Sequence, residues 1–224
     1  MRVIDLTLTI PRVEKECRRA GGPMADVTTV REAEWKIAGY TAMVYFIRHW
    51  GMAGTYLDLP GHIKELDDGT CADTYPLPKL YRMPATVIHL DRRDGSGKIT
   101  AAELAAACPR RIRGGALILN ALGRRRFDEI EMRSVYLGKD AVQWIVDTGV
   151  HLLVSDVYES NRDPQNVFWD LFAAHVSTVC LPVNLHLLDA PTARLTVLPL
   201  RLPGVTQLPC RVVAELAGRA RSDR

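Results

Sequence analysis

Apolar and polar residues alternate along several short stretches of the chain, which is typical of strands that bury one face. Residues 3–10 show this alternation before Pro11 ends it. Residues 33–37 and 41–47 show it again on either side of Gly39, and this arrangement predicts a hairpin. Further strands are predicted at residues 85–90, 116–119, 152–155, 176–185, 195–200 and 210–216.

Three other stretches have the pattern of helices. Thr100 precedes the run 101–107, and Glu103 stands three residues after it, so this pair predicts a capped helix. Two more helices are predicted at residues 140–148 and 167–174, and the charged segment 12–28 predicts a long loop. Because the helices are mixed with the strands without strict alternation, the pattern predicts one α/β or α+β domain over residues 1–224, with a mixed sheet.

The composition is that of an ordinary globular protein. With 47% hydrophobic and 25% charged residues, the 224-residue chain can bury a core. A net charge of +3 is too small to predict a nucleic-acid surface, and no apolar run is long enough to span a membrane. The five cysteines are scattered without a CxxC pair, so we expect free thiols and a cytoplasmic location.

The segment 51–62 is rich in glycine and proline and contains the residues with the clearest chemical potential. Asp58 and His62 stand on either side of Pro60, which limits how far the two side chains can drift apart. A carboxylate and an imidazole held in this way can bind one metal ion, or form a base and its orienting partner. The same two residues are explained equally simply as an aspartate that caps a turn and a histidine at the surface, with no functional role.

The same segment resembles the signature of the cyclase family, which includes bacterial kynurenine formamidases and isatin hydrolases. The family signature is His-x-Gly-Thr-His-x-Asp-x-Pro-x-His, and five of its seven fixed positions match in register here. Weaker matches extend the resemblance from near the start of the chain to near its end, in residues 3–7, 136–156 and 202–212. The matching segment is Met52-Ala53-Gly54-Thr55-Tyr56-Leu57-Asp58-Leu59-Pro60-Gly61-His62.

The resemblance implies a mixed sheet that wraps into a barrel-like core with helices outside. It also implies homo-oligomers, either dimers or tetramers, that hydrolyse a C–N or C–O bond in a small amide, formamide or lactone. By position in the signature, Asp58 resembles the ligand that bridges two divalent ions, and His62 resembles the residue that transfers the proton. His175 corresponds to a later histidine ligand of the family.

Three substitutions depart from what the family's two-metal centre requires. Met52 and Tyr56 stand where the family has histidine ligands, and Val183 stands where it has a late glutamate. A thioether and a neutral phenol are poor ligands for a divalent ion such as zinc or manganese. We therefore expect at most one ion in this protein.

The remaining donors predict a reduced site. One divalent ion, zinc or manganese, is expected to activate water for hydrolysis while held by Asp58, His62 and His175. Tyr56 is then expected to act as an acid or as a hydrogen-bond donor. Two other interpretations stay open: a non-catalytic protein that keeps the pocket as a binding surface, or a metal-free lyase or isomerase that uses Tyr56, Asp58 and His62.

Other residues extend the predicted site. Trp50 and Met52 are predicted to contact the substrate, although core packing is the simpler role for a tryptophan. The candidate replacements for the lost ligands are His49, His186 and Glu159, and an ordinary core, surface or loop position also explains each of them. The chain has no GxSxG elbow and no glycine-rich phosphate loop, so a serine hydrolase or a nucleotide-binding protein lacks support.

Overall fold

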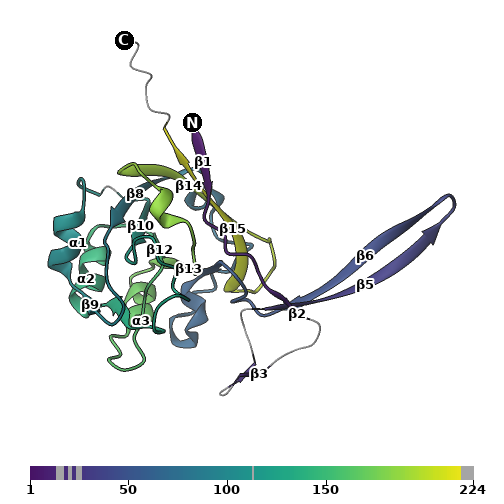
Figure 1. The fold of residues 1–224 in the computed structure, drawn as a ribbon, viewed down its shortest axis with the longest axis horizontal. Helices are drawn as coiled ribbons and strands as arrows, with labels where there is room; N and C mark the ends of the chain where they lie inside the picture. Colours follow the sequence, from purple (N-terminus) through teal and green to yellow (C-terminus); the bar gives the residue numbers. More distant parts are fainter. Residues whose placement is uncertain (14–17, 20–21, 24–26, 113, 218–224) are drawn as a thin grey trace, which may run out of the picture.

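The computed structural model describes residues 1–13, 18–19, 22–23, 27–112 and 114–217 of the chain. In these residues one large sheet curls into a barrel, and short helices cover part of its outer surface (Figure 1). A long hairpin projects away from this body (Figure 1). The barrel confirms the predicted mixed, barrel-like α/β fold.

Among the described residues, seven strands close the barrel by hydrogen bonding in a ring. In ring order they are β15 (Gln207–Leu216), β14 (Thr192–Pro199), β8 (Met83–His89), β10 (Ala116–Asn120), β12 (Leu152–Ser155), β13 (Ser177–Cys180) and β7 (Tyr56–Asp58). The neighbours from β8 to β13 run parallel, and the other pairs in the ring are antiparallel. The ring is completed where β7 pairs with both β13 and β15, and β1 (Arg2–Asp5) pairs with the last residues of β15, beyond those that pair with β7.

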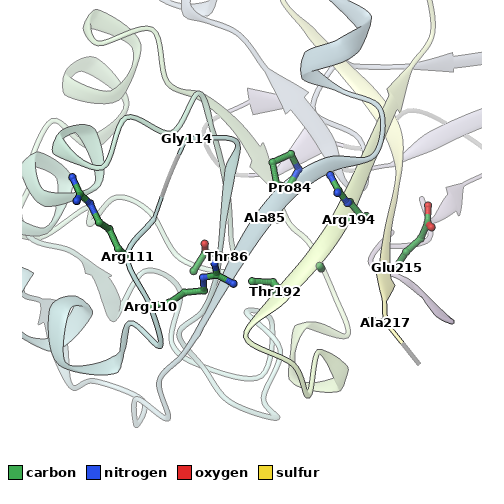
Figure 2. Close-up of a pocket in the computed structure, with 11 residues that line it drawn as sticks. Pro84, Ala85, Thr86, Arg110, Arg111, Gly114, Thr192, Arg194, Glu215 and Ala217 are labelled. Carbon is green, nitrogen blue, oxygen red and sulfur yellow. The ribbon is translucent and has the colours of Figure 1, made fainter. Parts of the chain in front are cut away.

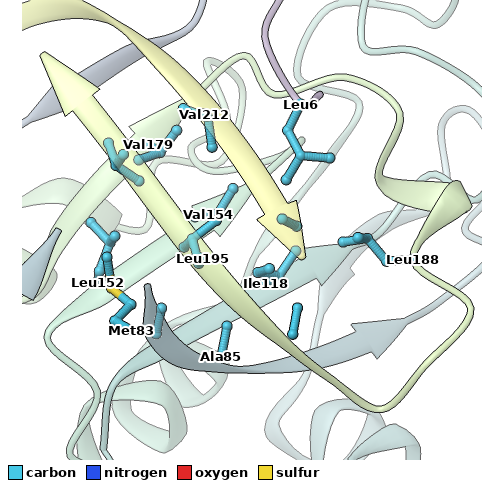
Figure 3. Packing of buried hydrophobic residues seen from close by; sticks show 14 of the residues in the cluster. Leu6, Met83, Ala85, Ile118, Leu152, Val154, Val179, Leu188, Leu195 and Val212 are labelled. Atoms are coloured by element: carbon cyan, nitrogen blue, oxygen red, sulfur yellow. The ribbon is translucent and has the colours of Figure 1, made fainter. Parts of the chain in front are cut away.

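The parallel strands are apolar at successive positions because both of their faces are buried. In β10, Ile118 belongs to the cluster inside the barrel, whereas Leu117 and Leu119 belong to the cluster outside it. Figure 3 shows the interior cluster, in which strands from different parts of the ring contribute side chains such as Val154 and Val212. Two buried faces therefore explain why residues 116–119 show no alternation.

Three helices cover the outer cluster. They are α1 (Ala101–Ala107), α2 (Lys139–Asp147) and α3 (Val167–Ala173). The start of α1 confirms the predicted cap, because the Glu103 amide donates to the Thr100 hydroxyl and the Thr100 amide donates to the Glu103 carboxylate. The buried side of α2 carries Ala141, Val142 and Ile145.

The predicted hairpin is present and is longer than predicted. It consists of β5 (Thr28–Ile37) and β6 (Tyr40–His49), joined through Gly39, which has a φ of 92°. The other strands are β2 (Arg12–Val13), β3 (Arg18–Arg19), β4 (Gly22–Pro23), β9 (Gly97–Ile99) and β11 (Val135–Leu137). The single-turn 3-10 helices are η1 (Pro60–His62), η2 (Lys64–Leu66), η3 (Leu77–Lys79) and η4 (Leu185–Leu187).

Several predicted boundaries need correction. The first strand ends at Asp5, well before Ile10. The strand predicted at 176–185 ends at Cys180, because Leu181 has a positive φ of 55° that an extended strand cannot contain. Segment 51–62, predicted to be irregular, contains the strand β7, and segment 12–28 lies partly outside the described residues.

Two of the compositional expectations can be compared with the structure. The free thiols in the described residues are Cys71, Cys108, Cys180 and Cys210, and Cys17 lies outside these residues. Within the same part of the chain, no helix combines the length and the apolar character needed to cross a membrane.

The close pairing of β8 and β10 depends on Gly115, which directly precedes β10. Gly115 has a φ of +74°, and a Cβ atom at this position would lie 2.2 Å from the carbonyl oxygen of Pro84. We expect Gly115→Ala to lower the free energy of unfolding by roughly 3 kcal/mol, because the strain of a positive φ adds to a clash with backbone.

Gly149→Ala is the matched control, since Gly149 has a φ of +73° but nothing lies within 4 Å of the place that a Cβ atom would occupy. This variant should lose only about 1 kcal/mol, from backbone strain alone. Urea unfolding of both variants gives the comparison, and equal losses would contradict a steric role for Gly115.

Candidate functional site

Asp58 ends β7 at the point where this strand closes the barrel. It pairs with Thr178 of β13 on one side and with Gln207 of β15 on the other. Because side chains alternate along a strand, Tyr56 and Asp58 point to one side of β7, while Leu57 packs in the barrel interior. The double pairing leaves only 2% of the surface of Asp58 exposed.

The single turn η1 follows β7 directly and positions His62. The Leu59 amide donates to the carbonyl oxygen of Thr206 at 2.9 Å, and the His62 amide donates to the carbonyl oxygen of Leu59, also at 2.9 Å. Pro60 occupies the first turn of η1, where its missing N–H costs nothing. At Gly61 a Cβ atom would lie 2.7 Å from the Thr206 side chain, so the turn can pack closely only with glycine here.

The two side chains face each other across this turn. His62 Nδ1 lies 3.3 Å from Asp58 Oδ1. The contact is not aligned as a hydrogen bond, so Asp58 Oδ1 has no hydrogen-bond partner among the described protein atoms, and neither has Gln207 Nε2 on the adjacent strand. Such buried, unpartnered polar atoms are rare in folded proteins, and they are more common where a catalytic group, a water molecule or an ion belongs. The imidazole is more open, with 37% of its side chain exposed.

Each member of this pair changes the proton affinity of the other. The interaction with Asp58 raises the pKa of His62 above its ordinary value of 6.5, and burial acts against this change. Burial raises the pKa of Asp58 above its ordinary value of 3.8, and His62 acts against this change. An imidazole and a carboxylate arranged in this way can act as a base and its orienting partner, and the raised pKa means that His62 holds its proton more strongly than an isolated histidine does.

Tyr56 lies on the same side of β7 as Asp58. Burial, together with the neighbouring Cys180 thiol, raises the pKa of Tyr56 far above its ordinary value, so the phenol stays protonated and can donate a hydrogen bond. Burial also raises the pKa of Cys180 to about 12, which makes it a neutral thiol. Phe172 of α3 adds an apolar wall, with its ring centroid 6.4 Å from that of His62.

Gly54 and Thr55 have a structural role in the signature segment. Gly54 has a φ of +62°, and a Cβ atom there would lie 2.6 Å from the Ile10 side chain. The Thr55 hydroxyl accepts a hydrogen bond from the Leu8 amide at 2.7 Å and donates one to the Leu181 carbonyl oxygen at 2.8 Å. These contacts hold the start of β7 between two segments distant in sequence.

His175 lies apart from this pair. It follows α3 with a φ of 55°, its side chain is 73% exposed, and its Nδ1 atom lies 3.4 Å from Asp68 Oδ2. In the part of the chain that the structure describes, no three histidine, cysteine, aspartate or glutamate side chains gather closely enough to hold a metal ion. Of the three predicted ligands, the structure therefore brings together Asp58 and His62, and the role of His175 as a ligand stays a prediction.

This pair falls short of the three protein ligands that a catalytic zinc site ordinarily has. The positions that could have supplied further ligands carry Met52 and Tyr56, and the buried phenol of Tyr56 stays protonated. Within the described ranges of the chain, the donor residues therefore do not fit the predicted zinc or manganese ion.

Trp50 and Met52 lie between β6 and β7, at the base of the hairpin. Trp50 is 53% exposed and Met52 is half-buried. Between them, Gly51 packs against β15 so closely that a Cβ atom would lie 2.6 Å from the carbonyl oxygen of Gln207. Their contact with substrate stays a prediction. His49 is the last residue of β6, and its Nδ1 atom lies 2.9 Å from the Trp50 carbonyl oxygen.

Two other candidate ligands lie elsewhere. The Glu159 carboxylate organises the loop before α3, because it accepts hydrogen bonds from the backbone amides of Ser160, Gln165 and Val167. His186 is exposed in η4. Neither residue therefore joins Asp58 and His62.

A pocket of about 320 Å³ lies at the amino ends of β8 and β10. Figure 2 shows that Arg110 points toward Thr86 and Thr192, whereas Arg111 points away from them. No residue of the predicted site lines this pocket. It is a hollow of mainly basic character, separate from Asp58 and His62.

Gln207 and Cys180 were not predicted as site residues. Cys180 lies two residues after Thr178 in β13, so the sequence could predict that they share a face, but it could not predict that β7 is the neighbouring strand. Gln207 follows the Pro203-Gly204 turn and had no pattern of its own. Both reach the site only because β7 lies between β13 and β15.

The fold is similar to that of solved metal-dependent hydrolases and isatin hydrolases. An isatin hydrolase bound to the product analogue thioisatinate matches with a TM-score of 0.76 and 17% identity, over 96% of this chain and 92% of that one. Isatin hydrolase A from Labrenzia aggregata matches with a TM-score of 0.71 and 19% identity, over 95% and 93%. A predicted metal-dependent hydrolase from Bacillus stearothermophilus matches with a TM-score of 0.68 and 21% identity, over 95% and 97%.

No curated protein matches the chain in sequence. The family model described as "Putative cyclase" matches residues 4–161, which is well over half of the chain and includes the whole signature segment. This match agrees with the resemblance of residues 52–62 to the cyclase signature, so this chain is a member of the cyclase family.

Proposed function

We propose that this protein is a hydrolase that cleaves a C–N or C–O bond in a small amide, formamide or lactone, and that Asp58 and His62 are its acid–base pair. The observation that carries the proposal is the buried Asp58 carboxylate, 3.3 Å from Nδ1 of the partly exposed His62. The reaction class is supported by the family and by the hydrolase names of similar structures.

In this proposal His62 activates the attacking water. Because Nδ1 faces Asp58, Nε2 is the nitrogen available to accept a proton from water. The water oxygen then attacks the carbonyl carbon of the substrate, and the protonated imidazole later gives its proton to the leaving nitrogen or oxygen. Asp58 stabilises the imidazolium in between, and its contact with Nδ1 is expected to tighten when substrate is bound.

Tyr56 is the best-placed residue to stabilise the negative charge on the carbonyl oxygen. Its raised pKa keeps the phenol protonated, and a neutral hydroxyl near an oxyanion donates without first losing charge. The phenol lies beside the Cys180 thiol, which is a weak hydrogen-bond acceptor and competes little for its proton.

We assign no step to a metal ion. The relatives named as metal-dependent hydrolases belong to the same fold, but the donor set in the described part of this chain consists of one carboxylate and one imidazole. With Met52 and Tyr56 in place of the signature histidines, water activation is assigned to His62.

Substitution of the pair tests the proposal directly. We expect His62→Gln to lower kcat on a responsive substrate from a panel of small amides, formamides and lactones by about 10²–10⁴-fold, because general-base catalysis is lost. Asp58→Asn should lower kcat by about 10-fold or more, because the amide cannot stabilise the imidazolium.

His175→Gln is the matched control, since His175 is exposed and paired with Asp68 away from the site. It should leave kcat and KM unchanged. If His175→Gln lowered kcat as much as His62→Gln does, the result would support the three-ligand metal site and contradict the proposed pair. If no substrate in the panel reacts, the non-catalytic interpretation replaces this proposal.

Removal of metal gives an independent prediction. Protein purified without chelators should contain less than about a tenth of an equivalent of zinc or manganese by elemental analysis, since a stable catalytic site needs about three protein ligands. Dialysis against EDTA should leave turnover unchanged. Loss of turnover that zinc or manganese restores would show that the catalyst is a metal centre.

A further inference from the structure

The pocket of about 320 Å³ at the amino ends of β8 and β10, here called the basic pocket, has a surplus of positive charge. Its charged residues are three arginines, Arg110, Arg111 and Arg194, and one carboxylate, Glu215. Glu215 already has a partner outside the pocket, because the Arg82 guanidinium lies 2.9 Å from its Oε2 atom. Among the described residues, none of the three arginines of the pocket forms an ion pair. Their charge is therefore open to a ligand.

Two strands give one wall of the basic pocket a pair of hydroxyl groups. Ala85 and Ala193 pack in the barrel interior, so the next residue of β8, Thr86, and the preceding residue of β14, Thr192, point outward. The strand register places these two threonines directly opposite each other. Thr86 is only 7% exposed, and the structure gives neither hydroxyl a hydrogen-bond partner among the described residues. Two free donors therefore lie side by side in this wall.

The segment that follows α1 brings a guanidinium to the same place. Within this segment Cys108 Sγ donates to the carbonyl oxygen of Arg110 at 2.9 Å, a contact that stabilises the local bend of the chain. Figure 2 shows the Arg110 side chain pointing toward Thr86 and Thr192. A guanidinium presents its N–H donors in a fixed plane that matches two oxygens of a phosphate or carboxylate. The basic pocket therefore combines an arginine fork with two hydroxyls.

We propose that the basic pocket binds a phosphate group, either as free phosphate or as part of a small phosphorylated molecule. A phosphate monoester carries about 1.5 to 2 negative charges at pH 7 and has three strong acceptor oxygens. The Arg110 fork can bind two of these oxygens, and the hydroxyls of Thr86 and Thr192 can donate to the third. The volume of about 320 Å³ lies at the lower end of the range for small-molecule pockets, about 300–1,000 Å³.

Other anions fit the basic pocket less well. A carboxylate has a single charge and two oxygens, so the Arg110 fork alone would satisfy it and the threonine hydroxyls would gain little. A single-stranded nucleic acid binds through aromatic rings on which its bases stack, and the described residues that line the pocket include no aromatic ring. The combination of charge and donors therefore favours a small phosphate ligand.

The basic pocket is independent of the proposed hydrolysis. None of its lining residues belongs to the candidate site around Asp58 and His62. Its ligand can be measured by binding alone, without any substrate of the enzyme. Failure of the phosphate proposal would therefore leave the acid–base pair untouched, and failure of the pair would leave the phosphate site untouched.

Equilibrium dialysis with radiolabelled inorganic phosphate at low ionic strength tests the proposal. Wild-type protein is expected to bind one phosphate per chain, and glycerol 3-phosphate should displace the label, whereas glycerol should not and acetate should require about 10-fold more. Arg110→Gln should raise the Kd for phosphate by about 10-fold or more, because charge-assisted hydrogen bonds are lost. Thr86→Val, which keeps the shape of the side chain, should raise it by about 3-fold or more.

Arg201→Gln is the matched control. It removes the same charge from an exposed arginine that follows the opposite end of β14 from Thr192, so the Kd should stay unchanged. Circular dichroism and the thermal midpoint of Arg110→Gln should also stay unchanged, because Arg110 is exposed. A lower Kd for glycerol 3-phosphate than for phosphate would identify a phosphorylated molecule as the ligand, and the reverse order would identify free phosphate.

Four results would overturn the proposal. They are the absence of saturable phosphate binding, a Kd for acetate equal to that for phosphate, an unchanged Kd in Arg110→Gln, and a loss in Arg201→Gln as large as that in Arg110→Gln. The last result would show that phosphate responds only to the overall charge of the protein.

Discussion

The closure of the barrel by β7 is the constraint on which the candidate site depends. This strand has three residues, and it is held on both sides by antiparallel neighbours, β13 and β15. The double pairing removes Asp58 from water while it leaves one of its carboxylate oxygens without a hydrogen bond from the described protein atoms. A barrel that opened at this seam would expose Asp58 and release the turn that carries His62.

The burial of Asp58 has an energetic cost that the fold must offset elsewhere. A buried carboxylate favours its neutral form, and the nearby imidazole favours the charged form, so the two groups compete over one proton. The apolar clusters on both sides of β10 supply the stability that allows such a residue to persist. A buried polar group whose desolvation is unfavourable, held in place by rigid packing around it, is an arrangement often found at catalytic sites.

Much of the fold could be predicted from local patterns. The cap formed by Thr100 and Glu103 depends on residues three positions apart, and the apolar run 116–119 shows its burial directly. The spacing of Asp58 and His62 around Pro60 also predicted that their side chains would lie close together.

The remainder of the site depends on long-range pairing, which no local pattern encodes. Thr178 and Gln207 meet Asp58 across more than a hundred residues of chain. His175 could be aligned with a family ligand, but a single positive φ after α3 directs it to Asp68 at the surface. The exposure of the hairpin formed by β5 and β6 could not be predicted either, because alternation in a strand predicts one buried face, whereas both faces of this hairpin are open.

The central claim is that Asp58 and His62 act as one coupled pair, and an NMR titration of the His62 imidazole tests it most directly. In wild-type protein the pKa of His62 should lie above its ordinary value of 6.5, because the Asp58 carboxylate stabilises the protonated ring. In Asp58→Asn that stabilisation is lost while the burial remains, so the pKa should fall below the wild-type value. A His62 pKa that is the same in both proteins would show that the two residues are neighbours without being partners, and would contradict the account.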